Sequence, residues 1–437
     1  SSAMAASSRP SSPGCCSDPW KSLLHSSTHA VLSCVVAGPK DTPPLQVEAL
    51  DKKRFIIAFC GSGTGHLTQA LAVVKMQQKA GLTLAGVVTD SDASEKMLKE
   101  MIAPLGVEVL ILPSIKIVDP VKGMVPIPLV AANILKVQQD LKKAHNDIIA
   151  FFGRTRPALV LSFWHITFAF WMQNLAKPPP EMKVTHVAAQ FALVSTLTLS
   201  DLRLPLEVIT MATADTMAGI FRSTGQCVPI SPTPSDAALA PILEIPPALK
   251  PKLPKLILCY FLVQKDAHQL EKLLAKEMTD INTYSFGEAE FHCFTSIPLP
   301  APSGRPLSLH SHAKQRQLFQ ELFARCTGVI VSSGNETVWE SVCRGVPVLT
   351  MPTTGHGEQL LNARVHARNF PQLVRAAPPH GCVEPGGLLT LPDVRWLVNY
   401  EHTDASMAES KHLRDHVSAL AGSMSQQGPS HVLAPPA

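Results

Sequence analysis

The chain has 437 residues, too many for one ordinary domain, so two domains are expected. Its net charge of +4 forms no basic stripe, which excludes a nucleic-acid footprint but allows weak attraction to an anionic surface, such as peripheral membrane contact. The ten cysteines show no C-x-x-C pair and no metal-ligand spacing, so we expect no metal site and a reducing compartment such as the cytoplasm.

Residues 1–50 are rich in Ser, Pro and Ala, and they contain few acids and no sustained period. We predict that this segment is disordered. An acid-poor, Ser-rich start is also typical of an organelle transit peptide, for example to a plastid, and an ordinary tail is an equally good interpretation.

From residue 51 onward, short runs that are apolar throughout alternate with helical periods. Such runs stand at residues 54–60, 82–90, 107–113, 157–163 and 183–190. Apolar strands that are each followed by a helix predict a parallel sheet covered on both faces. Residues 158–176 are long enough for a membrane helix, but polar residues interrupt them, so we interpret them as a strand, a turn and a buried helix.

A Pro-rich stretch at 221–255 breaks this rhythm and reads as a hinge. The rhythm restarts with apolar runs at 256–263, 290–296, 328–333 and 347–352. We therefore predict two Rossmann-like α/β domains, an N-terminal one over 51–247 and a C-terminal one over 248–422. A loose tail is expected over 423–437.

A glycine-rich turn follows the first predicted strand, and it consists of Gly61, Ser62, Gly63, Thr64, Gly65 and then His66. Glycines there let a ligand approach the backbone, and the amides at the start of the next helix attract anions. The spacing fits neither a P-loop nor a dinucleotide-binding motif, so a tight turn with an exposed His is also a valid interpretation.

A short helix is predicted after the apolar run GVIVSS. Ser333 and Glu336 have the spacing of a capping box, in which the serine caps the helix. Glu340 lies one turn later on the same face, where its carboxylate could accept ribose hydroxyls; solvent exposure is the alternative. The open amides around Gly334 and Asn335 could hold a phosphate.

A polar loop follows the apolar run PVLTMP, and it contains Thr353, His356, Glu358 and Gln359. These groups suit the hydroxyls of a hexose, because each buried hydroxyl needs both a donor and an acceptor. A solvated loop without a ligand is the alternative.

The stretches GSGTGHLTQALAVVKMQQKAG and SSGNETVWESVCRGVPVLTMPTTGHGEQLLNAR resemble GT-B glycosyltransferases. The resemblance is greatest to the group that includes the bacterial N-acetylglucosaminyltransferase of peptidoglycan-precursor synthesis. It implies a GT-B fold, with two Rossmann-like domains facing across a cleft. It also implies a hexosyltransferase whose N-terminal domain binds the acceptor and whose C-terminal domain binds a nucleotide-sugar donor, usually a UDP-sugar. Relatives of this kind generally invert the sugar configuration.

Carried over by position, Glu340 matches the ribose-binding Glu of the family, and Gln359 matches a Gln that contacts the donor sugar. Glu358 stands beside that Gln. Gly334 and Asn335 match the turn that faces the diphosphate. Glu336 and His356 are not shared by every branch, so their roles stay open.

His66 matches a His near the reacting centre, and we predict that it is the general base, since the imidazole pKa lies near working pH. Helix amides would stabilise the leaving diphosphate, so no metal ion or other cofactor is expected. Two alternatives are a nucleotide-sugar epimerase or hydrolase of the same fold, and a non-catalytic nucleotide-sugar-binding protein. The sequence indicates neither the acceptor nor the oligomeric state.

Asp90 and Asp92 resemble the D-x-D metal site of the other large glycosyltransferase fold, GT-A. Asp92 and Glu95 also fit a capping box for the next helix, and we favour that interpretation. His165 and Gln190 each follow a predicted strand, where they would line an acceptor site or serve as packed core residues.

Overall fold

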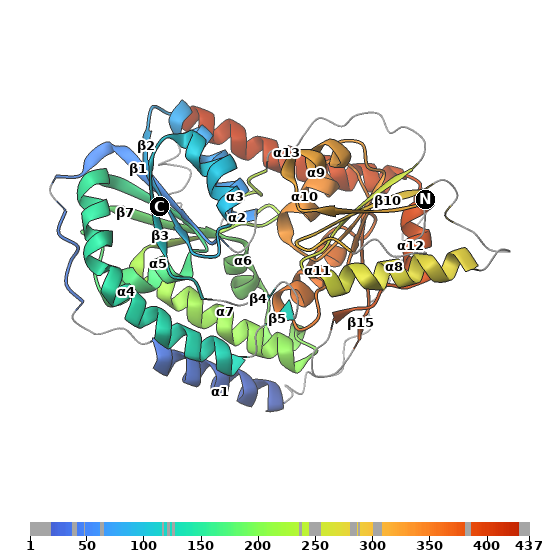
Figure 1. Cartoon of the computed structure of the whole chain (residues 1–437), viewed down its shortest axis with the longest axis horizontal. Coiled ribbons are helices and arrows are strands. Elements are labelled where there is room, and N and C mark those ends of the chain that lie inside the picture. Colours follow the sequence, from blue (N-terminus) through green and yellow to red (C-terminus); the bar gives the residue numbers. More distant parts are fainter. Residues whose placement is uncertain are drawn as a thin grey trace, which may run out of the picture.

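The computed structural model describes residues 19–36, 42–47, 49–61, 65–115, 118–119, 123–124, 127–235, 238–243, 255–279, 286, 289–299, 308–380 and 386–427. Two α/β units lie side by side, and each is built on a six-stranded sheet (Figure 1). The predicted boundary at 247 and 248 falls in a part of the Pro-rich hinge outside the described residues.

The N-terminal sheet has the strand order β3-β2-β1-β6-β7-β8, and its neighbours pair in parallel. Its strands are β1 (Asp51–Phe59), β2 (Thr83–Asp90), β3 (Glu108–Leu112), β6 (Pro157–Phe163), β7 (Lys183–Ala188) and β8 (Gln226–Pro229). The first five of these were predicted, because runs that are apolar throughout suit strands buried on both faces. The edge strand β8 was missed because it has only four residues and lies inside the stretch 221–255 that was interpreted as a hinge.

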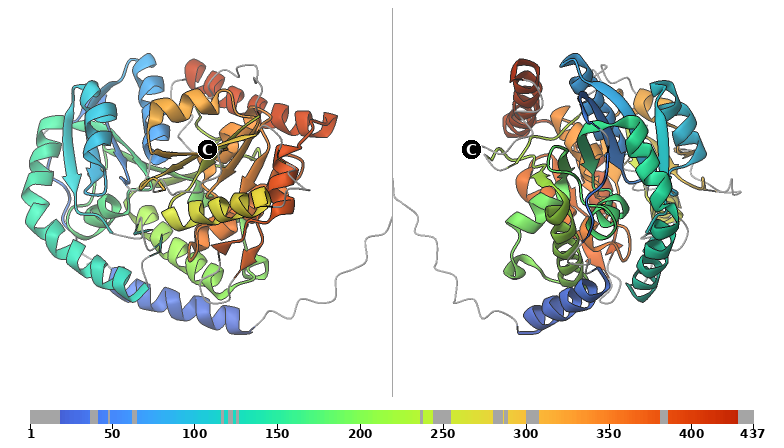
Figure 2. Two further views of the ribbon diagram at one scale, coloured as in Figure 1. Left: turned by 45° about the vertical axis from the view of Figure 1, so that its right-hand side comes forward. Right: turned by 90° about the vertical axis from the view of Figure 1, so that its left-hand side faces the viewer.

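Helices cover both faces of this sheet (Figures 1 and 2). They are α2 (Gly65–Lys79), α3 (Glu95–Met97), α4 (Ile127–Thr155), α5 (Ile166–Asn174), α6 (Ala189–Thr196) and α7 (Pro205–Thr224). The segment 158–176 forms β6 and the buried helix α5, which confirms the interpretation as strand, turn and helix. Within the described part of the chain, no helix combines the length and the hydropathy needed to cross a membrane.

The C-terminal sheet has the order β11-β10-β9-β12-β13-β14 and is also parallel. Its strands are β9 (Leu256–Tyr260), β10 (Glu290–Thr295), β11 (Leu309–Ala313), β12 (Gly328–Val331), β13 (Val348–Thr350) and β14 (Val374–Ala376). The helices are α8 (Gln264–Thr279), α9 (Arg316–Phe323), α10 (Asn335–Cys343), α11 (Gly357–Asn369), α12 (Leu391–Val398) and α13 (Asp404–Gln427). The predicted fold class, two parallel α/β units, is confirmed.

Both sheets share one continuous core. A single buried cluster contains Phe55 and Leu161 of the first sheet, Leu258 and Val329 of the second, and Leu413 of α13. Helix α13 packs against α10 and also reaches α2 of the first unit (Figure 1). Residues 423–427, expected to belong to a loose tail, continue α13, and residues 428–437 lie outside the described part.

The prediction of disorder over residues 1–50 is wrong for Pro19–Val36, which form helix α1. Figures 1 and 2 show α1 on the outside of the first unit, where it packs along α7. Leu32 is only 4% exposed, and Leu24 packs against a cluster that contains Val208 of α7. The helix is weakly amphipathic, so its stability comes from tertiary packing that the local pattern does not reveal. Residues 1–18 and 37–41 lie outside the described residues.

Candidate active site at the domain boundary

The two units meet at the carboxyl ends of their strands. Helix α2 follows β1 and α6 follows β7 in the first unit, while α10 follows β12 and α11 follows β13 in the second. Hydrogen bonds from the first two turns of these helices cross the boundary, as described below. In open parallel sheets, ligands bind at this end, and helix N-termini carry partial positive charge that attracts anions.

The first contact across the boundary joins α2 to α10. Gln69 Nε2 donates a 2.7 Å hydrogen bond to Glu336 Oε1. The same carboxylate lies so close to Gly65 that a Cβ at that position would be 2.6 Å from Glu336 Oε2. Burial raises the pKa of Glu336. Gln69 was not singled out from the sequence; its only signal is its position three residues after His66, on the same helix face.

The second contact joins α6 to α11. Gln190 Nε2 donates to Glu358 Oε1 at 3.0 Å, and Asn362 approaches the same oxygen at 3.5 Å. Burial raises the pKa of Glu358 to about 7, although these two amide donors oppose the shift. The negative charge of Glu336 adds to the increase, so the two carboxylates lie within electrostatic reach of each other.

Gly357 explains how α11 comes so near the first unit. A Cβ at this position would overlap the hydroxyl of Thr210 on α7 and would lie 3.0 Å from the backbone oxygen of Leu206. Only a glycine permits this approach, because it presents no side chain to the facing helix.

His66, Asp90 and His165 gather at the carboxyl ends of β1, β2 and β6. Burial lowers the pKa of His66 to about 4, Asp90 opposes the shift and His165 adds to it. His165 is 1% exposed and accepts a hydrogen bond from the Phe168 amide through Nδ1. Burial also lowers the pKa of His165. His165 is therefore packed as a core residue, yet it lies close to the predicted catalytic histidine.

The turn that carries His165 is strained. The preceding residue, Trp164, has a φ of 51°, an unusual value for a bulky side chain. Its ring packs against Phe191 and Phe221, which holds the conformation. Strain of this kind clusters at functional sites, where the surrounding structure maintains it.

The Asp90 carboxylate binds the backbone at the start of the glycine-rich turn. Its Oδ1 accepts hydrogen bonds from the amides of Gly61 and Asp92, both at 3.1 Å. The predicted cap at Asp92 is wrong, because the helix begins later and Ser94 accepts the amide of Met97. The middle of the turn, Ser62, Gly63 and Thr64, lies outside the described residues.

The predicted capping box at Ser333 and Glu336 is also wrong. Helix α10 begins at Asn335 with Gly334 as its N-cap, and no side-chain hydrogen bond caps it. Ser333 is therefore not the N-cap. The carboxylate of Glu336 reaches across the boundary to Gln69 instead. Ser333 is fully buried, and its hydroxyl has no hydrogen-bond partner among the described residues.

A buried network supports the loop after β13. Gln359 Oε1 accepts the amide of Thr353 at 2.8 Å, and the Thr353 hydroxyl donates to Asp266 Oδ2 at 2.9 Å. Burial raises the pKa of Asp266 to about 7. Gln359 therefore fixes its own loop through its oxygen. Asp266 was not predicted to take part, because an acid in the first turn of a helix is ordinarily explained by the helix dipole.

Several buried polar atoms at this boundary have no hydrogen-bond partner among the described residues. They are His66 Nδ1, Gln69 Oε1, Gln190 Oε1, Ser333 Oγ and His356 Nδ1. Burial lowers the pKa of His356, at the N-cap of α11, to about 4. Glu340 is half-buried one turn after Glu336 on α10. Native proteins rarely leave so many buried polar groups unpaired, so the boundary is suited to a polar ligand.

No protein-family model matches the chain, and no curated protein matches it either. Solved structures do match. The chain is similar to UGT2 of Phytolacca americana, solved with UDP-2-fluoroglucose and pterostilbene, with a TM-score of 0.52 and 12% identity over 88% of this chain and 98% of that one. Together with the two parallel sheets, this match decides the architecture. The chain has the GT-B fold.

Two further GT-B matches are the kitacinnamycin glycosyltransferase and the calicheamicin glycosyltransferase CalG4. The first has a TM-score of 0.51 and 12% identity, over 88% of this chain and 100% of that chain. The second has a TM-score of 0.50 and 14% identity, over 88% and 98%. At these identities the likeness establishes the fold, and it does not single out the peptidoglycan-precursor group.

Proposed function

We propose that the chain is a glycosyltransferase that moves a hexose from a nucleotide-sugar donor, most simply a UDP-sugar, to an acceptor hydroxyl. One observation carries the proposal: the pairs Gln69–Glu336 and Gln190–Glu358 bring together four helix N-termini at the carboxyl ends of both sheets. The donor's diphosphate would find backbone amides there, and the buried polar atoms would find hydroxyl partners.

The donor belongs to the second unit in this proposal. Glu340 accepts the ribose hydroxyls, and the amides of Gly334 and Asn335 hold the diphosphate. Glu358 and the amide nitrogen of Gln359 contact the hexose, since the Gln359 oxygen is already bonded to Thr353. The fold is shared with a protein that was solved with UDP-2-fluoroglucose, which supports a UDP-sugar as the donor.

The reaction requires one bond to form and one to break. The acceptor oxygen attacks the anomeric carbon while the bond from that carbon to the diphosphate breaks, and the diphosphate leaves with the electron pair. His66 takes the acceptor's proton. Burial lowers its pKa to about 4, so the ring is neutral and can accept a proton at working pH, but it is a weaker base than the imidazole with a pKa near working pH that the sequence led us to expect. Helix N-termini stabilise the charge that develops on the diphosphate, so the step needs no metal ion.

A thermal-shift screen with UDP-, GDP- and dTDP-sugars tests the donor assignment. We expect one nucleotide class to raise the unfolding temperature, since a ligand that binds only the folded state stabilises it. Turnover of that donor with an added acceptor then separates a transferase from a binding protein, and turnover without an acceptor indicates a hydrolase or an epimerase. If no nucleotide sugar or nucleoside diphosphate stabilises the protein, the proposal is wrong.

A further inference from the structure

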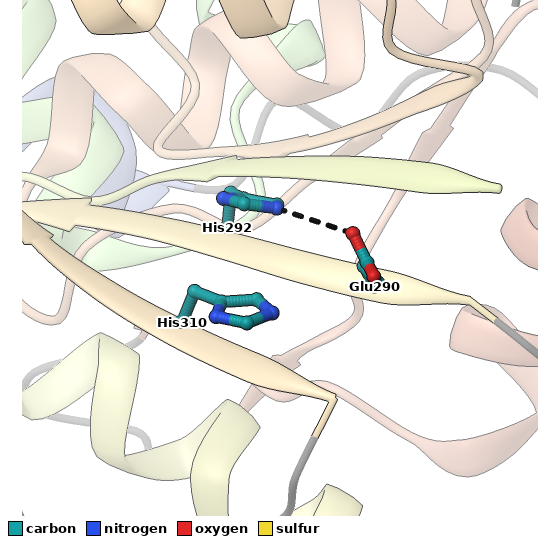
Figure 3. Close-up of side chains that lie close together, drawn as sticks. All are labelled: Glu290, His292 and His310. Atoms are coloured by element: carbon teal, nitrogen blue, oxygen red, sulfur yellow. Dashed lines mark ion pairs between the residues drawn. The ribbon is translucent and has the colours of Figure 1, made fainter. Parts of the chain in front are cut away.

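Three side chains with metal-binding chemistry lie together on the C-terminal sheet, away from the domain boundary. They are Glu290 and His292 on β10 and His310 on the neighbouring strand β11 (Figure 3). One ligand atom from each lies within 4.8 Å of the other two, and no other such trio occurs among the described residues. His292 Nε2 lies 3.6 Å from Glu290 Oε2.

Strand geometry places these side chains on one face. Glu290 and His292 are two residues apart, so they point to the same side of the sheet. His292 pairs in register with His310 across the parallel strands, and their rings stack with centroids 4.6 Å apart. Phe291 and Cys293 point to the opposite face and are fully buried in its core, which fixes the register of β10.

A fourth side chain, His312 on β11, orients His292. Nδ1 of His292 lies 3.0 Å from Nε2 of His312, and the two rings are nearly parallel, with an angle of 2° between their planes. When His292 Nδ1 carries the proton, its N–H group donates a hydrogen bond to His312 Nε2, and the lone pair of His292 Nε2 is left on the side of Glu290. Histidines that bind metals are commonly held in this way, with the other ring nitrogen bonded to a neighbour.

We propose that Glu290, His292 and His310 bind one divalent transition-metal ion, with Zn²⁺ as the best fit. Two imidazoles and one carboxylate are a known zinc donor set, and a water molecule would complete four-fold coordination. Metal–ligand bonds of about 2.0–2.2 Å require the three atoms to draw closer by on the order of 1 Å, which side-chain rotation achieves. His310 is exposed, so an ion can enter from solvent.

This site is separate from the proposed reaction. In the register of the sheet, His292 is level with Leu258 and Val329, and Val329 lies four residues before Ser333. The backbone of His292 is therefore displaced from Ser333 by roughly 13 Å toward the amino ends of the strands, and β10 lies two strands away from β12. The ion would connect β11, which is the edge strand, to β10, so its effect falls on the stability of this edge and not on glycosyl transfer.

The test is a calorimetric Zn²⁺ titration of the full chain after EDTA treatment and dialysis. We expect one tight site, at least tenfold weaker in His310→Gln and in Glu290→Gln. His268→Ala is the matched control, because His268 pairs with Glu271 on α8 but belongs to no trio among the described residues, and it should retain the site. His310 is exposed, so its variant should fold, which circular dichroism checks.

Cobalt gives an independent readout. Co²⁺ in the same site should show the intense visible bands of four-coordinate cobalt, and His310→Gln should remove them. Zn²⁺ should also raise the unfolding temperature of the native chain but not that of His310→Gln. The proposal is overturned if the titration shows no stoichiometric site, or if His310→Gln and Glu290→Gln bind zinc as tightly as the native chain.

Discussion

Gln69 and Glu336, 267 residues apart in the chain, share a 2.7 Å hydrogen bond between α2 of one domain and the first turn of α10 in the other. Glu336 thereby keeps a partner although its helix is capped by Gly334 rather than by a capping box. A buried carboxylate without such a donor would be costly, so this bond favours the close approach of the domains.

Gly357→Ala should separate the domains, because the new Cβ would overlap Thr210 and press on the backbone at Leu206. We expect transfer to slow at least tenfold and the radius of gyration from small-angle X-ray scattering to rise. Gly219→Ala is the control: nothing lies within 4 Å of a Cβ at that helical position, and the change should stabilise the protein by about 0.5–1 kcal/mol. Normal turnover in Gly357→Ala would show that close approach is not needed.

Glu340→Ala should weaken donor binding by about 1–3 kcal/mol, because hydrogen bonds to a charged acceptor would be lost. The unfolding temperature without ligand should barely move, since the side chain is only half-buried. Calorimetric titration of the donor measures the effect, and Glu321→Ala, an exposed acid on α9, serves as the control. Unchanged donor affinity in Glu340→Ala would refute the ribose assignment.

Transfer activity should survive EDTA, because helix amides and not a metal ion are assigned to the diphosphate. The Asp90 carboxylate is bonded to the Gly61 and Asp92 amides, which agrees with a structural role. Initial rates before and after chelation give the answer. Complete loss of activity that manganese restores would instead support a metal site at Asp90 and Asp92. If zinc restored the activity that EDTA removed, and if His310→Gln also lost activity, the proposed metal site on β10 and β11 would be required for transfer.

His66→Ala should lower turnover by about 10²–10⁴-fold while donor affinity changes little, if the ring is the general base. The native rate should fall as pH decreases, since only the neutral ring accepts a proton. Burial lowers the pKa of His66 to about 4, so this fall belongs near pH 4 and not near 6.5. Parallel donor titration and saturating rates on the variant provide the measurement. Near-normal turnover of His66→Ala would show that His66 is not the general base, and His165 or an acidic group would then be the next candidate.

Glu358→Gln should stabilise the ligand-free protein at pH 8 and have little effect below pH 4.5. The pKa of Glu358 is about 7 in the folded chain, compared with 4.5 for an exposed Glu such as that of the unfolded chain. Between pH 4.5 and pH 7 the folded state therefore keeps a proton that the unfolded state has released. The native carboxylate therefore costs stability above pH 7, and the cost disappears as pH falls to 4.5.

We expect a gain of about 1–2 kcal/mol at pH 8, less than the full shift implies at 1.36 kcal/mol per pKa unit, because the side chain is partly open to solvent. Urea unfolding at pH 8 and at pH 4.5 measures it, with Glu401→Gln, an exposed acid, as the control. Equal effects of Glu358→Gln at both pH values would contradict the buried-carboxylate explanation.

The sequence by itself determined most strands of the two sheets and the fold class. Nine apolar runs, among them those that form β1 and β12, are strands in the structure, and His66 begins a helix at the carboxyl end of β1 as expected. These features were readable because burial on both faces of a parallel sheet imposes a local pattern on each strand. The polar loop after β13 was placed correctly for the same reason.

Only the tertiary structure decided which polar groups meet. The partners of Glu336 and Glu358 lie in the other domain, and bonds between residues so distant leave no local signature. The capping predictions at Ser333 and Asp92 failed because a motif of four residues cannot reveal a competing partner from elsewhere in the fold or a helix that starts later. Helix α1 was missed because its order comes from packing on α7, and tertiary burial outweighs weak local propensity.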